Sequence, residues 1–213
     1  YASGKGVTQN NLYAHMWFNV AESIGNVTAM ENRGIIAGKM TAADISKAED
    51  LANALVAAGL PIAEITLRTP ASLEALKIAA NNKDLHVGVG SLRNGEDLKK
   101  AIDAGATFAV SAGFSPSVAA EANKQGIPYF PGVSTPTEML QAINEGITTL
   151  KFFPAETLGG VNALKAMSAP FPGISFMPTG GITAANAQQY LELASVVAVG
   201  GSWMVAQKLI DAG

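Results

Sequence analysis

Three charged residues stand inside apolar segments of this sequence, where a charge is costly and therefore informative. Glu64 and Arg68 occur in the run Ile62–Arg68, and Lys151 interrupts the otherwise apolar run Leu150–Phe153. A charged side chain taken out of water destabilises the fold unless it is paired, so such residues often mark a functional site. A carboxylate, a guanidinium and an amine together can transfer protons, bind a carboxylate and attack a carbonyl carbon.

The strand predicted around Glu64 carries its polar residues on one face. Successive side chains of a strand point to opposite faces, so Ala63 and Ile65 lie on the apolar, helix-facing side. Glu64, Thr66 and Arg68 then point into a barrel, toward its mouth. The chemical interpretation is an acid or base, Glu64, beside a carboxylate-binding fork, Arg68. The alternative is a structural ion pair between the two.

Lys151 is predicted to point inward from its own strand. Leu150 and Phe152 share the helix-facing parity, so Lys151 lies on the opposite face. A low-dielectric surrounding lowers the pKa of a lysine, which yields the neutral amine needed to attack a ketone and form a Schiff base. The alternative is a lysine whose charge reaches the surface or is ion-paired.

Two glycine-rich turns follow the last two predicted strands. Thr179-Gly180-Gly181 follows one strand, and Gly200-Gly201-Ser202 follows the other. Barrels often bind phosphate with these two loops, because glycine lets backbone N–H groups approach the phosphate oxygens and serine adds a hydroxyl donor. The alternative for each stretch is an ordinary turn.

Three further polar residues lie next to predicted strands. Ser91, after Gly88-Val89-Gly90, places a hydroxyl at the predicted mouth. Thr135-Pro136-Thr137-Glu138 is interpreted as a helix N-cap rather than as part of the site. Glu156, in the loop after Lys151, is interpreted as an exposed loop carboxylate rather than as a residue that lines the site.

Short apolar runs alternate with longer amphipathic runs along the chain. The eight predicted strands are Gly34–Gly38, Ile62–Thr66, His86–Val89, Phe108–Ser111, Pro128–Pro131, Thr149–Phe152, Ser175–Pro178 and Val196–Val199. Helical patterns lie between them, and helix C-caps are predicted at Gly59, Gly105, Gly126 and Gly146. This alternation predicts an α/β fold, a closed (β/α)8 TIM barrel. The alternative, an open doubly wound sheet, lacks its glycine fingerprint at Gly38-Lys39-Met40.

The length of 213 residues and the 48% apolar content predict one domain. We expect this single barrel domain to cover residues 9–213, with an extra amphipathic helix at Gln9–Ile24 before the barrel. Residues 1–8 are expected to be a flexible terminus or a vector remnant.

Composition narrows the classes of function. There are no cysteines and two histidines, so a thiolate or histidine-rich metal site is not expected, although an all-oxygen magnesium site stays open. The net charge of −3 and the absence of a basic stripe argue against nucleic-acid binding. Gly, Pro and charged residues break every apolar run before it could span a membrane. A cytoplasmic protein is expected.

Four motifs, in this order, resemble those of the 2-keto-3-deoxy-6-phosphogluconate (KDPG) aldolases and 4-hydroxy-2-oxoglutarate (KHG) aldolases, which form one family. They are Glu64-Ile65-Thr66-Leu67-Arg68-Thr69, Lys151-Phe152-Phe153-Pro154-Ala155-Glu156, Pro178-Thr179-Gly180-Gly181-Ile182 and Gly200-Gly201-Ser202-Trp203. The resemblance runs from about Arg33 to Asp211. It implies a metal-independent class I aldolase without a cofactor, acting on a phosphorylated keto acid, and a homotrimer.

The resemblance also implies a role for each matching residue. Lys151 forms the Schiff base and Glu64 shuttles protons. Arg68, with Ser91, holds the substrate carboxylate. Gly180, Gly181, Gly201 and Ser202 bind the phosphate, and Thr66, Phe152 and Thr179 belong to the substrate pocket.

Two departures from the family pattern concern substrate preference. The family's Gly-Ala-Gly-Thr reads Gly88-Val89-Gly90-Ser91 here, and its Ser-Pro turn reads Ser111-Ala112-Gly113. Two rival functions also remain open. One is a phosphosugar isomerase or epimerase that uses Glu64 as its base, and the other is a non-catalytic phosphate-ligand binding barrel.

Overall fold

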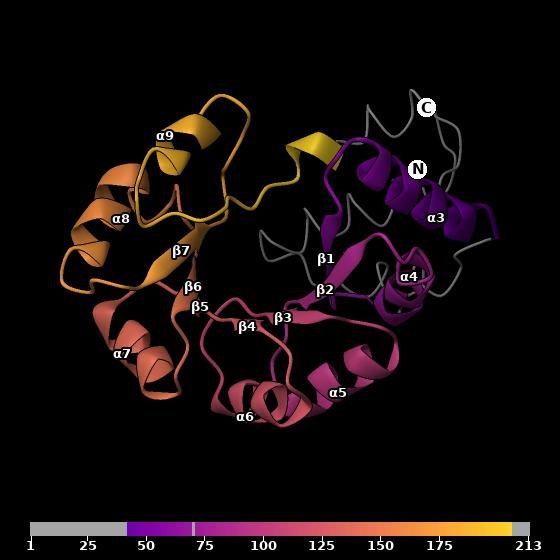
Figure 1. Ribbon diagram of the computed structural model, residues 1–213, viewed down its shortest axis with the longest axis horizontal. Helices are drawn as coiled ribbons and strands as arrows, with labels where there is room; N and C mark the ends of the chain where they lie inside the picture. The colour runs from indigo at the N-terminus through magenta and orange to yellow at the C-terminus, as the bar shows by residue number, and fades with distance from the viewer. Residues whose placement is uncertain (1–41, 70, 206–213) are drawn as a thin grey trace, which may run out of the picture. The chain divides into compact units, whose positions relative to one another are not determined.

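The computed structural model describes residues 42–69 and 71–205, whose elements are labelled in Figure 1. By its internal contacts, the chain divides into two compact units. The first unit takes Tyr1–Val89 and Lys100–Thr107, and the second takes Gly90–Lys99 and Phe108–Gly213.

The first unit alternates helix and strand. Its described elements are α3 (Ala42–Ala57), β1 (Ile62–Thr66), α4 (Ser72–Ala79) and β2 (His86–Gly90). β1 and β2 are neighbours in one sheet, and the His86 N–H donates to the Pro61 carbonyl at 2.8 Å beside them. The apolar side chains of Leu76 and Val87 are buried between these elements, at 0% and 1% exposure. α3 is joined to the end of α4 by a 2.8 Å hydrogen bond from the Asn82 amide to the Asn53 side-chain oxygen.

Helix α5 (Gly95–Asp103) is divided between the two units at Lys99, and the second unit continues the alternation with short parallel strands. After α5, the elements are β3 (Phe108–Val110), α6 (Pro116–Gln125), β4 (Tyr129–Phe130), β5 (Gly132–Val133), α7 (Pro136–Asn144), β6 (Thr149–Phe152), α8 (Gly160–Ser168), β7 (Ser175–Pro178), α9 (Ala187–Leu191) and the 3-10 helix η1 (Trp203–Val205). β3 pairs with β4 in parallel, and β5, β6 and β7 form a parallel sheet in that order.

One face of the β5–β7 sheet is covered by α7, α8 and α9 (Figure 1). The side chains between them form one core cluster, in which Leu150, Phe152, Leu164, Phe176 and Tyr190 are fully buried. Burial of such side chains stabilises the fold by roughly 1.5–3 kcal/mol each. The polar residues of β6, Thr149 and Lys151, therefore lie on the strand face opposite this cluster.

Most strand predictions agree with the structure, and β1, β6 and β7 have the predicted bounds. The predicted strand Pro128–Pro131 was too simple, because the chain forms β4 and β5 on either side of Pro131. The predicted strand Val196–Val199 is wrong as a continuous strand. Two isolated parallel bridges, Phe176 to Val196 and Thr179 to Gly200, take its place. Proline has no N–H, so Pro178 cannot donate to the ladder between these bridges.

Chain reversals follow the predicted capping chemistry. Gly59, Gly105, Gly126 and Gly146 all have positive φ, between 69° and 105°, as the ends of helices require. Thr135 caps α7 in a capping box, in which its hydroxyl accepts from the Glu138 N–H at 3.3 Å and the Glu138 carboxylate accepts from the Thr135 N–H at 2.9 Å. The N-cap prediction is confirmed.

The predicted α/β class, with parallel strands that alternate with helices, is confirmed. The predicted first strand, Gly34–Gly38, and the extra helix, Gln9–Ile24, lie outside the described residues. Ring closure and a single domain over 9–213 therefore stay predictions.

Candidate active site

Lys151 is held inside the parallel sheet of the second unit. Its backbone N–H donates to the Pro131 carbonyl at 2.8 Å, and its register partners are Gly132 on β5 and Met177 on β7. Its exposure is 7%, and it is the only charged residue in the buried class among residues 48–69 and 71–205. An ammonium in this position pays a desolvation penalty that a neutral amine does not, which suits a nucleophile.

The Lys151 side chain has an aromatic neighbour on its own face of the chain. Its Nζ lies 5.1 Å from the centroid of the Phe153 ring, two residues along. Such contact attracts an ammonium or an iminium to the face of the ring. Phe152 points to the other face and is fully buried in the core cluster. Its predicted contact with the substrate stays a prediction, while its packing fixes the strand that carries Lys151.

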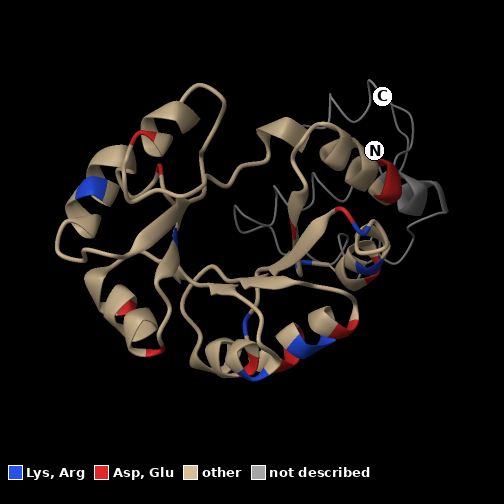
Figure 2. Cartoon of the chain, in the orientation of Figure 1, with Lys and Arg blue, Asp and Glu red and all other residues tan. Residues whose placement is uncertain are grey.

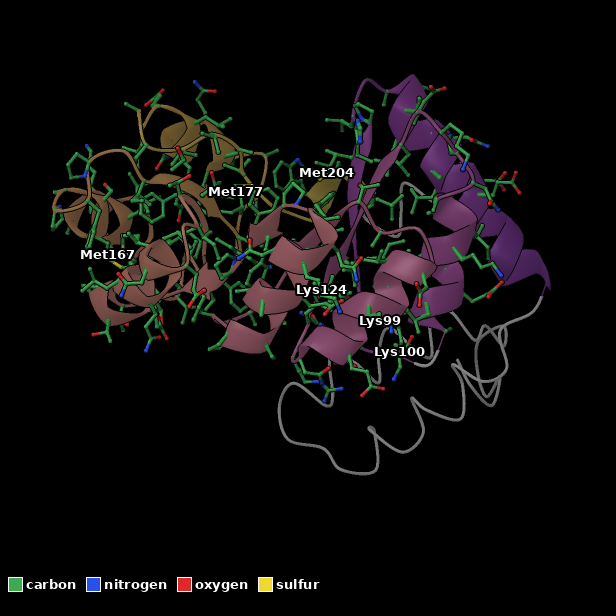
Figure 3. All side chains as sticks on the ribbon, turned by 60° about the horizontal axis from the view of Figure 1, so that its bottom comes forward. Lys99, Lys100, Lys124, Met167, Met177 and Met204 are labelled. Carbon is green, nitrogen blue, oxygen red and sulfur yellow. The ribbon has the colours of Figure 1, made fainter. Side chains whose placement is uncertain are left out.

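Lysines on the helices have different surroundings from Lys151. Figure 2 shows charged residues gathered mainly on helices, and Figure 3 labels Lys99, Lys100 and Lys124 on the helical ribbon. All three are exposed, and Lys124 lies 3.8 Å from Glu121 in a surface ion pair. Their interpretation as solvated surface lysines agrees with the structure, which leaves Lys151 as the exception.

The turn after β7 requires glycine at two successive positions. Gly180 and Gly181 have φ of 99° and 80°, in the left-handed region that side chains disfavour. A Cβ on Gly180 would lie 3.1 Å from the Pro154 Cα, and one on Gly181 would lie 2.6 Å from the Glu156 Cγ. The turn is thus packed directly on the loop that follows Lys151.

Backbone hydrogen bonds join the same two loops. The Ala155 N–H donates to the Thr179 carbonyl at 2.8 Å, and the Glu156 N–H donates to the Gly180 carbonyl at 3.1 Å. The Phe153 ring also lies against this turn, because its Cδ2 is 3.3 Å from the Cβ position of Gly180. The Phe153 ring therefore contacts both the Lys151 side chain and the glycine turn.

The second glycine-rich turn lies beside the first. Thr179 forms a parallel bridge with Gly200, and the Gly200 N–H donates to the Pro178 carbonyl at 2.9 Å. Gly201 and Ser202 follow at once and are exposed, before η1 begins at Trp203. The structure thus brings together both turns that the sequence predicted to bind phosphate.

Glu64, Thr66 and Arg68 lie on β1 or just after it, in the first unit. Glu64 and Arg68 are exposed, whereas Ala63 and Ile65 on the other face are half-buried, as the predicted alternation requires. The C-terminal end of this motif is held by a local hydrogen bond, in which the Arg68 N–H donates to the Thr66 carbonyl at 2.9 Å. That these three residues act together with Lys151 stays a prediction.

Ser91 follows β2 in a left-handed conformation with φ of 59°. A non-glycine residue there costs about 1–2 kcal/mol, and such strain is concentrated at functional sites. In the neighbouring loop, the buried Ser111 hydroxyl donates to the Gly113 carbonyl at 2.6 Å and is 2.6 Å from the Tyr129 hydroxyl. The Tyr129 oxygen also accepts from the Ser115 N–H at 3.2 Å, so this loop is fixed without the family's proline.

Glu156 has a role that the sequence interpretation missed. It is exposed, as expected, but its carboxylate accepts a hydrogen bond from the buried Tyr190 hydroxyl on α9. The two residues are far apart in sequence, and no motif spacing connects them.

Comparison with known proteins decides the family. The model of the KDPG and KHG aldolase family matches residues 27–213. The chain belongs to this family. A curated relative from Pseudoalteromonas atlantica (strain T6c / ATCC BAA-1087), 2-dehydro-3-deoxy-phosphogluconate aldolase, is 41% identical over 183 residues, which are 85% of this chain and 85% of the relative. Aldolases are lyases, so the predicted enzyme class is confirmed.

Two solved structures of KDPG aldolases resemble this fold. The enzyme of Legionella pneumophila, with pyruvate captured at low pH as a covalent carbinolamine intermediate, is 38% identical with a TM-score of 0.75, over 79% of this chain and 82% of that one. The enzyme of Zymomonas mobilis ZM4 with 3-phosphoglycerate is 43% identical with a TM-score of 0.73, over 75% and 77%.

Proposed function

We propose that this aldolase cleaves 2-keto-3-deoxy-6-phosphogluconate into pyruvate and glyceraldehyde 3-phosphate through an imine on Lys151. The observation that carries the proposal is a buried lysine on a parallel strand whose following loop is bonded to the Gly180–Gly181 turn, which in turn adjoins the second glycine turn at Gly200. A nucleophile and a candidate anion site are thereby joined in one unit. The pyruvate carbinolamine of the Legionella pneumophila relative and the 3-phosphoglycerate of the Zymomonas mobilis relative support the two halves of the proposal.

The reaction needs a neutral amine first. The Lys151 amine attacks the C2 ketone, and loss of water leaves an iminium ion. The C3–C4 bond then breaks with its electron pair moving into the iminium, while Glu64 accepts the proton of the C4 hydroxyl, so the aldehyde departs. The enamine left behind is protonated at C3 and hydrolysed, which releases pyruvate and restores the amine. The iminium is the electron sink, so this sequence of steps requires no metal or cofactor.

Substrate binding is divided among the remaining residues. Arg68 binds the carboxylate as a fork, with Ser91 as a further donor. The turns with Gly180, Gly181, Gly201 and Ser202 hold the phosphate, with Thr66, Phe152 and Thr179 assigned to the pocket. Phosphate binding far from the reacting carbons supplies orientation energy. The unphosphorylated 4-hydroxy-2-oxoglutarate is a second substrate of the proposal, cleaved to pyruvate and glyoxylate.

The proposal extends to assembly and location. We infer a homotrimer that works in the cytoplasm, as the family resemblance implies. None of the helices formed by residues 42–69 and 71–205 has the length and apolar character needed to cross a bilayer. Sedimentation of the purified chain measures the assembly directly, and a monomer at working concentrations would overturn the trimer.

Pyruvate release distinguishes this proposal from an isomerase or a binding protein. Purified protein mixed with 2-keto-3-deoxy-6-phosphogluconate should release pyruvate and glyceraldehyde 3-phosphate in equal amounts. Lys151→Ala should lose at least on the order of 10⁴-fold in kcat, because the covalent route is closed. The matched control is Lys165→Ala, which removes an exposed lysine of α8 and should leave kcat unchanged. Near-normal turnover by Lys151→Ala would overturn the assignment.

A further inference from the structure

The loop after β6 and the turn after β7 are joined by more than backbone hydrogen bonds. The Glu156 side chain passes directly below the second glycine of the turn, since a Cβ on Gly181 would lie 2.6 Å from its Cγ and 2.7 Å from its Cβ. The Gly181 carbonyl accepts from the Asn186 amide at 3.2 Å. The Glu156 side chain therefore occupies the space that a side chain at position 181 would need, and it packs directly against the left-handed turn.

The carboxylate of Glu156 is directed to a defined place. It accepts from the Tyr190 hydroxyl, and its Oε1 lies 3.3 Å from the Cβ position of Gly160, where α8 begins. The partial positive charge of a helix N-terminus stabilises a carboxylate there. The carboxylate thus has a hydrogen-bond donor and a helix start beside it, although the residue lies next to a turn assigned to bind phosphate.

Tyr190 is suited to be a permanent donor. Its side chain is fully buried in the core cluster of the second unit, which fixes the ring, and only its hydroxyl reaches Glu156. Burial, the hydrogen bond to Glu156 and the negative charge of that carboxylate all raise the pKa of Tyr190 far above its ordinary value. The phenol therefore stays protonated at every pH at which the enzyme works.

We propose that Glu156 and Tyr190 are positioning residues that hold the Gly180–Gly181 turn in its phosphate-binding conformation, tie it to the strand of Lys151 and thereby set the preference for phosphorylated over unphosphorylated keto acids. This inference rests on the proposed function, because it concerns the phosphate end of the same site. It acts through the turn, so neither side chain is required to touch substrate.

The test compares two substrates in conservative variants. Tyr190→Phe keeps the ring in the core and removes the hydroxyl, and Glu156→Gln keeps the shape and removes the charge. We expect KM for 2-keto-3-deoxy-6-phosphogluconate to rise about tenfold in each, because Tyr190→Phe loses a hydrogen bond to a charged group, whereas Glu156→Gln keeps an acceptor but loses the charge that strengthens the bond. The kcat/KM for 4-hydroxy-2-oxoglutarate, which has no phosphate, should stay within about twofold of wild type on the same reasoning.

Coupling between the two residues gives a second measurement. If they act through one hydrogen bond, the double variant should raise KM little more than either single variant. Inorganic phosphate, as a competitive inhibitor, should also bind about tenfold more weakly to each single variant. Glu192→Gln, the same change at an exposed position next to α9, is the control and should alter none of these values.

The outcomes separate this inference from the proposed function. If wild type fails to release pyruvate from either substrate, both are overturned. If wild type is active and the variants lose activity equally on both substrates, or on neither, the proposed function stands and the positioning role is wrong. A selective loss on the phosphorylated substrate, with weaker phosphate inhibition, supports it.

Discussion

Strands β1 and β6 carry the charged residues of the proposed site in opposite surroundings. On β6, Lys151 is 7% exposed, and its loop is bonded and packed onto the Gly180–Gly181 turn. On β1, Glu64 and Arg68 are exposed, and the apolar neighbours on the other face are only half-buried. Lys151 is thus buried within its own unit, whereas Glu64 and Arg68 lie on the surface of theirs.

This difference teaches how the two regions should respond to mutation. A residue on the exposed face of β1 contributes through chemistry with the substrate, so replacing it should change kinetics with little change in stability. A residue in the packed β6–β7 region is part of the scaffold and of the site at once. Replacing it should change both, unless the replacement keeps the shape. The following predictions test this contrast.

The largest effect after the loss of Lys151 is expected at the proton carrier of β1. Glu64→Gln should lower kcat by about 10²–10⁴-fold, because the C4 hydroxyl loses its base. The free energy of unfolding, measured with urea, should change by less than about 0.5 kcal/mol, as at an ordinary exposed site. Wild-type kcat would remove Glu64 from the mechanism, and a large loss of stability would contradict its surface role.

The carboxylate fork of β1 should affect binding more than turnover. Arg68→Lys keeps the charge but loses the bidentate geometry, so KM should rise by about 10–100-fold. Product inhibition by pyruvate should weaken to a similar degree, because pyruvate retains the substrate's carboxylate but not its phosphate. Arg93→Lys, at another exposed arginine, is the matched control. If Arg68→Lys left KM as unchanged as Arg93→Lys does, the bidentate role of Arg68 would be wrong.

Breaking the packed region requires a change at Gly181. Gly181→Ala adds a Cβ at φ of 80° and 2.6 Å from the Glu156 Cγ, so it should destabilise the fold by about 1–3 kcal/mol and raise KM for the phosphorylated substrate. Gly146→Ala is matched in strain, with φ of 78° and nothing within 4 Å of the added Cβ.

The control variant separates strain from contact. Gly146→Ala should cost about 1 kcal/mol of stability through its left-handed backbone and leave KM unchanged. Kinetics and urea unfolding of the two variants provide the comparison. If both variants raise KM equally, the effect of Gly181→Ala comes from a general destabilisation of the fold and not from the contact between residue 181 and Glu156.

The smallest effect is expected at the cap of α7, which contains no residue of the proposed site. Burial alone would raise the pKa of Glu138, but hydrogen bonds from Ser134 and Thr135 outweigh it and lower the pKa. A lowered pKa in the folded state means that the stabilisation is present above the unfolded value, near 4.5, and is lost as the pH falls through the folded value.

Glu138→Gln should therefore destabilise the protein at pH 7 by less than about 1 kcal/mol, since the carboxylate is partly exposed and screened. The difference from wild type should shrink as the pH is lowered below 4.5, the ordinary value for this group. Glu145 lies at the C-terminal end of α7 and takes no part in the capping box, so Glu145→Gln should show no such loss at pH 7. A difference that is constant with pH would contradict the role of the charge.

Local patterns predicted the strands that carry Glu64 and Lys151 better than they predicted long-range contacts. The alternation around Glu64 and Lys151 gave the bounds of β1 and β6, because strand parity depends only on neighbouring residues. The split at Pro131 and the loss of the last strand depend on single prolines that lack a backbone donor. The Tyr190–Glu156 hydrogen bond joins helix α9 to the loop after β6, two segments far apart in the sequence, so no spacing in the sequence predicts it.

The central claim is that Lys151 becomes covalently bound to the substrate carbon, and borohydride trapping tests it most directly. Protein incubated with pyruvate and reduced with borohydride should gain the mass of a reduced pyruvate adduct, and peptide mapping should place it on Lys151. The adduct should be absent from Lys151→Ala and retained in Lys165→Ala. An adduct on another lysine, or none on folded protein with excess pyruvate, would contradict this account.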